Sequence, residues 1–232
     1  MLICQSMQNT SHIKNSNNSS AMATSLKNIG VVIGSTRVNR IGDQVAEFVK
    51  STLSAAQTGI PVRLKMIDIN SFNLPIFDEA VMPAVVPAQA QFAHEHSKAW
   101  NAEIEKYDAY VFVTAEYNFG IPGGTKNAID YLYHVWIGKP VLIVSYGIMG
   151  GRAASASLKT TLEGMRLQVV DTRPSFEFPE RNPEQHNMSP GLLGSMEGKL
   201  IDSVVEDWQT KTGELLQGYR QLIEKLESAR GE

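Results

Sequence analysis

Short apolar runs alternate with segments of helical periodicity along most of this chain. The apolar runs are nearly continuous in Val, Ile and Leu, which is typical of strands buried on both faces of a parallel sheet. Strands are predicted at residues 28–35, 62–69, 108–114, 139–147 and 167–172. Helices are predicted between them, at residues 41–56, 89–105, 125–136 and 152–166. The chain therefore reads as repeated strand–helix units.

This alternation predicts an α/β fold, a flavodoxin-like doubly wound sheet of five parallel strands in the order 2-1-3-4-5 with helices on both faces. A truncated Rossmann fold is the alternative. Residues 27–232 are expected to form one domain, and its last helix, with an apolar stripe from Ile201 to Leu226, should cover a sheet face. Residues 1–26 are expected to be a disordered tail, with a transit peptide as the alternative.

Composition argues against several classes of partner. The 232-residue chain has 21 basic and 24 acidic residues and a formal net charge of −3, so a general attraction to nucleic acid or to an anionic membrane is not expected. No apolar run has the length of a membrane-spanning helix. The only cysteine is Cys4, which excludes an intramolecular disulfide and favours the cytoplasm.

Three loops should meet at the carboxyl edge of the sheet, where open α/β sheets bind ligands. The first loop, GSTRVNRIGD (34–43), offers hydroxyls, two arginines and the start of a helix, a combination that suits a single phosphate. It has neither the Walker spacing nor the dinucleotide glycine pattern. An ordinary turn with solvated arginines is the alternative.

The second loop, EYNFGIPGG (116–124), combines a polar aromatic, an amide, three glycines and a proline, more special residues than a plain turn requires. Its backbone amides could donate to the polar edge of a flat ring. The third loop, SYGIMGGRAAS (145–155), has glycines that permit a close approach of the backbone to a ligand. Convergence of the three loops predicts a site for a flat, phosphorylated molecule.

The motifs GSTRVNR, TAEYNFGIPGGTKNAIDYL and SYGIMGGRAA resemble the flavin-binding loops of the NADPH-dependent FMN reductases. This resemblance covers roughly residues 28–172. It implies non-covalent FMN, NADPH or NADH as the hydride donor, a quinone, free flavin or similar small molecule as acceptor, and a homodimer or homotetramer. No catalytic side chain is implied, because the flavin itself carries the hydride.

The resemblance also implies the cofactor-binding residues. Ser35, Arg37 and Arg40 would hold the phosphate, and Ala115 stands where the family usually has a proline. The full set expected at the cofactor is Ser35, Arg37, Arg40, Ile41, Ala115, Glu116, Tyr117, Asn118, Phe119, Ser145, Tyr146 and Gly147.

Other functions are weighed against this one. A flavodoxin-like electron carrier or redox-responsive binding protein would share the loops but lack a nicotinamide site, and a relative that has lost flavin is a third possibility. A serine hydrolase is disfavoured because no nucleophile elbow is present. His94 and His96 are expected on one helix, pointing apart, so no metal is predicted. The aromatic run YLYHVW (131–136) is expected either in the core or on a subunit interface.

Overall fold

The computed structural model describes residues 25–179 and 188–228. The expected tail falls almost wholly outside these ranges. Six parallel strands form one sheet in the order β2-β1-β3-β4-β5, with β6 also paired to β4. The predicted order of the first five strands is confirmed. The strands are β1 (Lys27–Ile33), β2 (Val62–Asp68), β3 (Ala109–Ala115), β4 (Pro140–Gly147), β5 (Gln168–Val169) and β6 (Ser175–Glu177).

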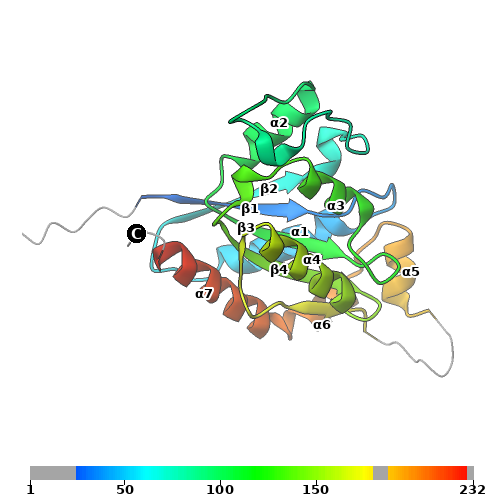
Figure 1. Ribbon diagram of the computed structural model, residues 1–232. Coiled ribbons are helices and arrows are strands. Elements are labelled where there is room, and N and C mark those ends of the chain that lie inside the picture. The colour runs from blue at the N-terminus through cyan, green and yellow to red at the C-terminus, as the bar shows by residue number, and fades with distance from the viewer. Residues whose placement is uncertain (1–24, 180–187, 229–232) are drawn as a thin grey trace, which may run out of the picture.

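Helices cover both faces of this sheet, as predicted (Figure 1). One apolar cluster joins the sheet to α1, α6 and α7, and the other joins the opposite face to α2, α3 and α4. The α-helices are α1 (Gly42–Ser54), α2 (Glu95–Ile104), α3 (Gly123–Asp130), α4 (Arg152–Gly164), α5 (Pro190–Met196), α6 (Asp202–Gln209) and α7 (Thr212–Ser228). Short 3-10 helices occur at Ile69–Phe72, Pro83–Val85 and His134–Trp136.

The last predicted strand, residues 167–172, is reduced to β5, and a strand that was not predicted, β6, follows it. Strand β5 pairs with the start of β4, and β6 pairs with its end, so together they form one interrupted edge. Pro174 lies in the interruption and has no amide proton, although its carbonyl still accepts from the amide of Ser145 at 3.0 Å. The sequence pattern missed β6 because three residues are too few to show a period.

Three predicted helices also have different bounds. The helix expected at 89–105 begins only at Glu95, and α3 ends at Asp130, before the aromatic run. The C-terminal stripe is divided between α6 and α7 at residues 210–211, but Trp208 and Leu215 still pack in the same cluster. Periodicity identified the buried face correctly and could not identify a break that leaves that face intact.

The aromatic run 131–136 belongs mainly to the core. Tyr131 and Trp136 are fully buried, and the indole of Trp136 packs edge-on against Tyr110 with ring centroids 5.1 Å apart. Of the two expected positions for this run, the structure supports the core. No helix within the described ranges is long and apolar enough to cross a membrane.

Helix α7 depends on a glycine where it crosses the sheet. A Cβ at Gly218 would lie 2.6 Å from Leu142 Cδ1 and 2.9 Å from the carbonyl oxygen of Thr172. The backbone carbonyl cannot move as a flexible side chain does. We therefore expect Gly218→Ala to lower the free energy of unfolding by about 1–3 kcal/mol, measured by urea denaturation.

Gly164→Ala is the matched control for this substitution. A Cβ at Gly164, at the end of α4, would meet nothing within 4 Å. Alanine should therefore be neutral there or stabilising by up to about 1 kcal/mol. Equal changes in the two variants would contradict the close packing of α7 on β4.

Candidate flavin site

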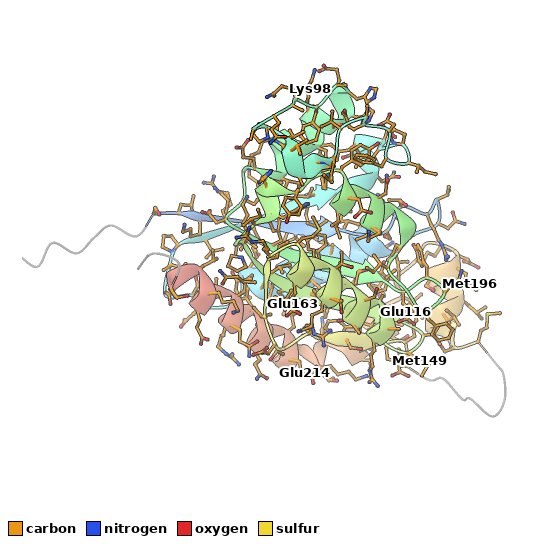
Figure 2. All side chains as sticks on the ribbon, viewed as in Figure 1. Lys98, Glu116, Met149, Glu163, Met196 and Glu214 are labelled. Atoms are coloured by element: carbon orange, nitrogen blue, oxygen red, sulfur yellow. The ribbon has the colours of Figure 1, made fainter. Side chains whose placement is uncertain are left out.

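The three loops meet at the carboxyl end of the strands, as predicted. They enclose a cavity of about 420 Å³. Helix α5 lies beside this end of the sheet, where the strand arrows point (Figure 1). Figure 2 shows Glu116, Met149 and Met196 together at this end of the molecule. The cavity is lined by Arg37, Val38, Asn39, Arg40, Ile41, Ala115, Glu116, Tyr117, Tyr146, Gly147, Ile148, Phe178, Leu192, Ser195 and Met196.

The first loop presents unsatisfied donors. The Ser35 hydroxyl is completely buried beside the Tyr146 phenol, and its oxygen has no partner at hydrogen-bond distance and angle within the described part of the chain. It lies against the start of α1, where a Cβ on Gly42 would come 2.0 Å from its oxygen. No side chain caps α1, so its first amides are also open. These buried donors beside a helix start suit an anionic oxygen.

The two arginines of the first loop have different surroundings. Arg40 donates from Nη1 to Asp68 Oδ1 at 2.9 Å and to the carbonyl of Ser35 at 2.7 Å, and from Nη2 to Asp68 Oδ2. The hydrogen bond with Asp68 raises the pKa of Arg40 above its usual value. Arg40 therefore ties the first loop to the end of β2. Arg37 is exposed and has no carboxylate partner among the described residues, and its guanidinium carbon lies 3.5 Å from the centroid of the Tyr117 ring.

The second loop is a two-residue hairpin. Tyr117 and Gly120 exchange two backbone hydrogen bonds of 3.1 Å, with Asn118 and Phe119 between them at φ of 50° and 61°. Positive φ at both central residues is the pattern of a type I′ turn. Neither central amide has an acceptor among the described residues. Both remain free to donate to a ligand.

Glu116 acts as a helix cap. Its carboxylate Oε2 accepts from the amides of Ala153 at 2.8 Å and Ala154 at 3.1 Å, in the first turn of α4. These charge-assisted bonds join the second loop to the helix that follows the third loop. This contact could not be predicted from a local pattern, because Glu116 and Ala153 are 37 residues apart in the chain.

Only some of the residues predicted in the third loop face the cavity. Tyr146 and Gly147 line the cavity, and burial raises the pKa of the Tyr146 phenol. Ser145 is fully buried and faces away, donating to the carbonyl of Gly150 at 2.8 Å. Its side-chain position differs from the one predicted, because successive residues of a strand point to opposite faces.

The predicted residues thus fall into two groups. Eight line the cavity: Arg37, Arg40, Ile41, Ala115, Glu116, Tyr117, Tyr146 and Gly147. Ser35, Asn118, Phe119 and Ser145 do not line it. The residues that sequence reasoning missed include those of α5, whose short segment shows no recognisable motif. Gln44 holds the chain after α5 by donating to Gly198 O and accepting from the Leu200 amide, both at 2.9 Å.

The expected geometry of the two histidines is wrong. His94 precedes α2 rather than lying within it, and the His94 and His96 rings are stacked with centroids 5.1 Å apart. Both rings face Asp78, whose Oδ1 lies 3.0 Å from His96 Nε2. The extended backbone at His94 places the two side chains on the same side. The described residues contain no group of three or more His, Cys, Asp or Glu side chains arranged to hold a metal ion.

Replacing Glu116 tests its capping role. Glu116→Ala should lower the free energy of unfolding by about 0.5–2 kcal/mol, because two amides of α4 lose their acceptor. Glu116→Gln should lie between this variant and the wild type, since it keeps one acceptor oxygen without the charge. Glu224→Ala, at an exposed position on α7, is the control and should change stability little. Thermal and urea denaturation measure the effect, and an unchanged Glu116→Ala protein would contradict it.

Phe119 offers a test of backbone strain in the hairpin. Its side chain is 77% exposed, yet its φ lies in the left-handed region that disfavours residues with a Cβ. We expect Phe119→Gly to be more stable than Phe119→Ala by roughly 0.5–1 kcal/mol, after the entropy cost of glycine is included. A glycine variant less stable than the alanine variant in urea would show that the turn is unstrained.

Comparison with known proteins identifies the family of the chain. Residues 27–178 match the model of the family described as NADPH-dependent FMN reductase. An NAD(P)H-dependent FMN reductase of Nectria sp is 44% identical over 167 residues, which cover 72% of this chain and 83% of that relative. A quinone reductase of Pseudomonas putida is 32% identical over 159 residues, covering 66% and 75%.

Solved structures agree on the fold. The flavoenzyme NAD(P)H:(acceptor) oxidoreductase of Paracoccus denitrificans aligns with a TM-score of 0.56 and 21% identity, over 87% of this chain and 98% of that one. At this identity the likeness concerns the fold alone. The family match covers most of the chain and includes all three loops. The chain therefore belongs to the NADPH-dependent FMN reductase family.

Proposed function

We propose that this chain uses NADPH or NADH to reduce a quinone, a free flavin or a similar small acceptor through FMN held by the three loops. One observation carries the proposal. The buried hydroxyl of Ser35 has no hydrogen-bond partner among the described residues and lies beside the uncapped start of α1, next to a cavity lined by Arg37 and Tyr117. The amides of Asn118 and Phe119, in the hairpin that begins at Tyr117, also have no acceptor among those residues. This donor set matches a molecule with a phosphate at one end and a polar ring at the other.

The phosphate end belongs to the first loop in this proposal. The backbone amides of Ser35, Thr36 and Arg37 have no acceptor among the described residues, and consecutive free amides favour an anion. Arg37 adds a charge without a competing carboxylate. Arg40 keeps the loop in place through Asp68 and Ser35, so we assign it to positioning the loop rather than to holding the phosphate.

The ring end belongs to the second and third loops. The amides of Asn118 and Phe119 would donate to the polar edge of the ring, and Tyr146 and Gly147 would border it. When bound, FMN supplies an acceptor for the hydride of the nicotinamide and a donor of two electrons to the second substrate. The chain contributes fixed donors that favour negative charge on the ring, and Leu192 and Met196 add apolar side chains to the cavity lining.

The names of two relatives support a quinone or a flavin as the electron acceptor. The Pseudomonas putida relative is named a quinone reductase, and the Nectria sp relative an FMN reductase. We also propose a cytoplasmic location, supported by the lone cysteine, and a homodimer or homotetramer. Exposed apolar side chains at Ile76 and Met82 support assembly. Sedimentation velocity would reveal the oligomer.

Anaerobic stopped-flow absorbance tests the function. FMN-loaded protein mixed with NADPH or NADH should lose its flavin band, and addition of a quinone should restore it. If neither nicotinamide bleaches the flavin, the protein is an electron carrier or a redox-responsive binding protein. If the protein does not bind FMN, the cofactor assignment fails as well.

Arg37→Ala tests the phosphate assignment. Removing a charge-assisted hydrogen bond worth about 1.5–3 kcal/mol should weaken FMN binding by roughly 10- to 150-fold in a fluorescence titration. Arg63→Ala, on the exposed side of β2, removes the same charge far from the loops and should leave affinity unchanged. Equal FMN affinity in the two variants would show that Arg37 does not bind the phosphate.

A further inference from the structure

A second cavity of about 680 Å³ lies on the other side of the third loop. Gly147 and Ile148 of this loop line the flavin cavity, whereas Ser145 and Arg152 line the second cavity. Glu214, one of its lining residues, lies on the lower edge of the molecule in Figure 2. The lining residues are Ser145, Arg152, Ser155, Arg173, Pro174, Ser175, Phe176, Thr210, Lys211, Gly213 and Glu214.

The charge of this cavity is positive. Three cations line it, Arg152, Arg173 and Lys211, against the single carboxylate of Glu214. Lys211 is paired with Asp207. Within residues 25–179 and 188–228, neither arginine forms an ion pair. The cavity is therefore lined by two guanidinium groups that have no ion-pair partner among the described residues.

Arg173 is held in place with one donor unsatisfied. Its Nη1 donates to the Ser155 hydroxyl at 3.0 Å, and Ser155 is only 4% exposed. Its Nε is buried and has no hydrogen-bond partner within the described residues. A buried charged donor without an acceptor is costly, and a guanidinium matches the oxygens of a phosphate or carboxylate in a fork geometry.

The walls of the cavity are fixed before any ligand binds. The hydroxyls of Ser145 and Ser175 both donate to the carbonyl of Gly150, at 2.8 and 2.9 Å. A Cβ at Gly150 would lie 2.0 Å from the Ser175 hydroxyl oxygen, so the approach is close. The amides of Ala153 and Ala154 are already bonded to Glu116. Binding in this cavity therefore depends on side chains and not on the start of α4.

We propose that this cavity is a second anion site, which binds a phosphate group through Arg173, with Arg152 and the Ser155 hydroxyl as further donors. The phosphate has two possible sources. It could be the 2′-phosphate of NADPH, reaching past the third loop from the flavin cavity, or the phosphate of a separate small molecule. Binding of the group itself does not depend on the proposed function.

Inorganic phosphate is the probe for this site. FMN-loaded protein is used so that the first loop is already filled, and ionic strength is kept constant with chloride. Phosphate should raise the melting temperature saturably. Arg173→Gln should raise the Kd by about tenfold or more, and Arg152→Gln, at an exposed position with no fold role, by about threefold. Arg63→Gln, which removes the same charge on β2, should match the wild type.

Steady-state kinetics separate the two sources. If the 2′-phosphate is the ligand, Arg173→Gln raises KM for NADPH and leaves KM for NADH unchanged. If a separate molecule is the ligand, KM for both nucleotides stays unchanged while the phosphate-dependent stabilisation is still lost. Equal stabilisation by phosphate in all four proteins, or none in the wild type, overturns the proposal. The melting measurement does not need activity, so a failed reductase assay would be distinguishable.

Discussion

The carboxylate of Glu116 joins two of the three loops on which the flavin site depends. It accepts hydrogen bonds from two backbone amides in the first turn of α4, so the end of β3 and the start of α4 keep a fixed separation. The ion pair of Arg40 with Asp68 does the equivalent for the first loop, at the end of β2. Two acidic side chains therefore fix the loops, and the Ser35 hydroxyl and the hairpin amides are left without partners beside the cavity.

Some charged residues of the site therefore hold the loops in place, and other groups remain free to bind a ligand. Arg40 and Glu116 use their charges inside the protein, whereas Ser35 and the hairpin amides have no partners there. A preformed set of donors loses little entropy when it binds. The strained φ at Phe119 fits such a site, because the same turn leaves the amides of Asn118 and Phe119 without an acceptor among the described residues.

Much of the fold could be predicted from the sequence. Buried runs such as residues 139–147 gave the strands, and their alternation with helices gave the order 2-1-3-4-5, which is confirmed. Family membership and the expectation of FMN-dependent NAD(P)H chemistry are also confirmed. The ends of helices and strands were harder to predict from the sequence, because β6 is short and the break between α6 and α7 leaves the apolar stripe intact. The roles of Glu116 and Arg40 arise from contacts distant in sequence. The sequence of α5, which forms one wall of the cavity, contains no motif that would have predicted this position.

The central claim is that FMN lies in the cavity between the three loops, with its phosphate at the first loop. A crystal structure of the protein with FMN tests it most directly. We expect the phosphate within hydrogen-bond distance of the Ser35 hydroxyl and Arg37, and the ring against the amides of Asn118 and Phe119. Glu116 should remain bonded to α4. A phosphate bound elsewhere, or a hairpin that must unfold to admit the ring, would contradict it.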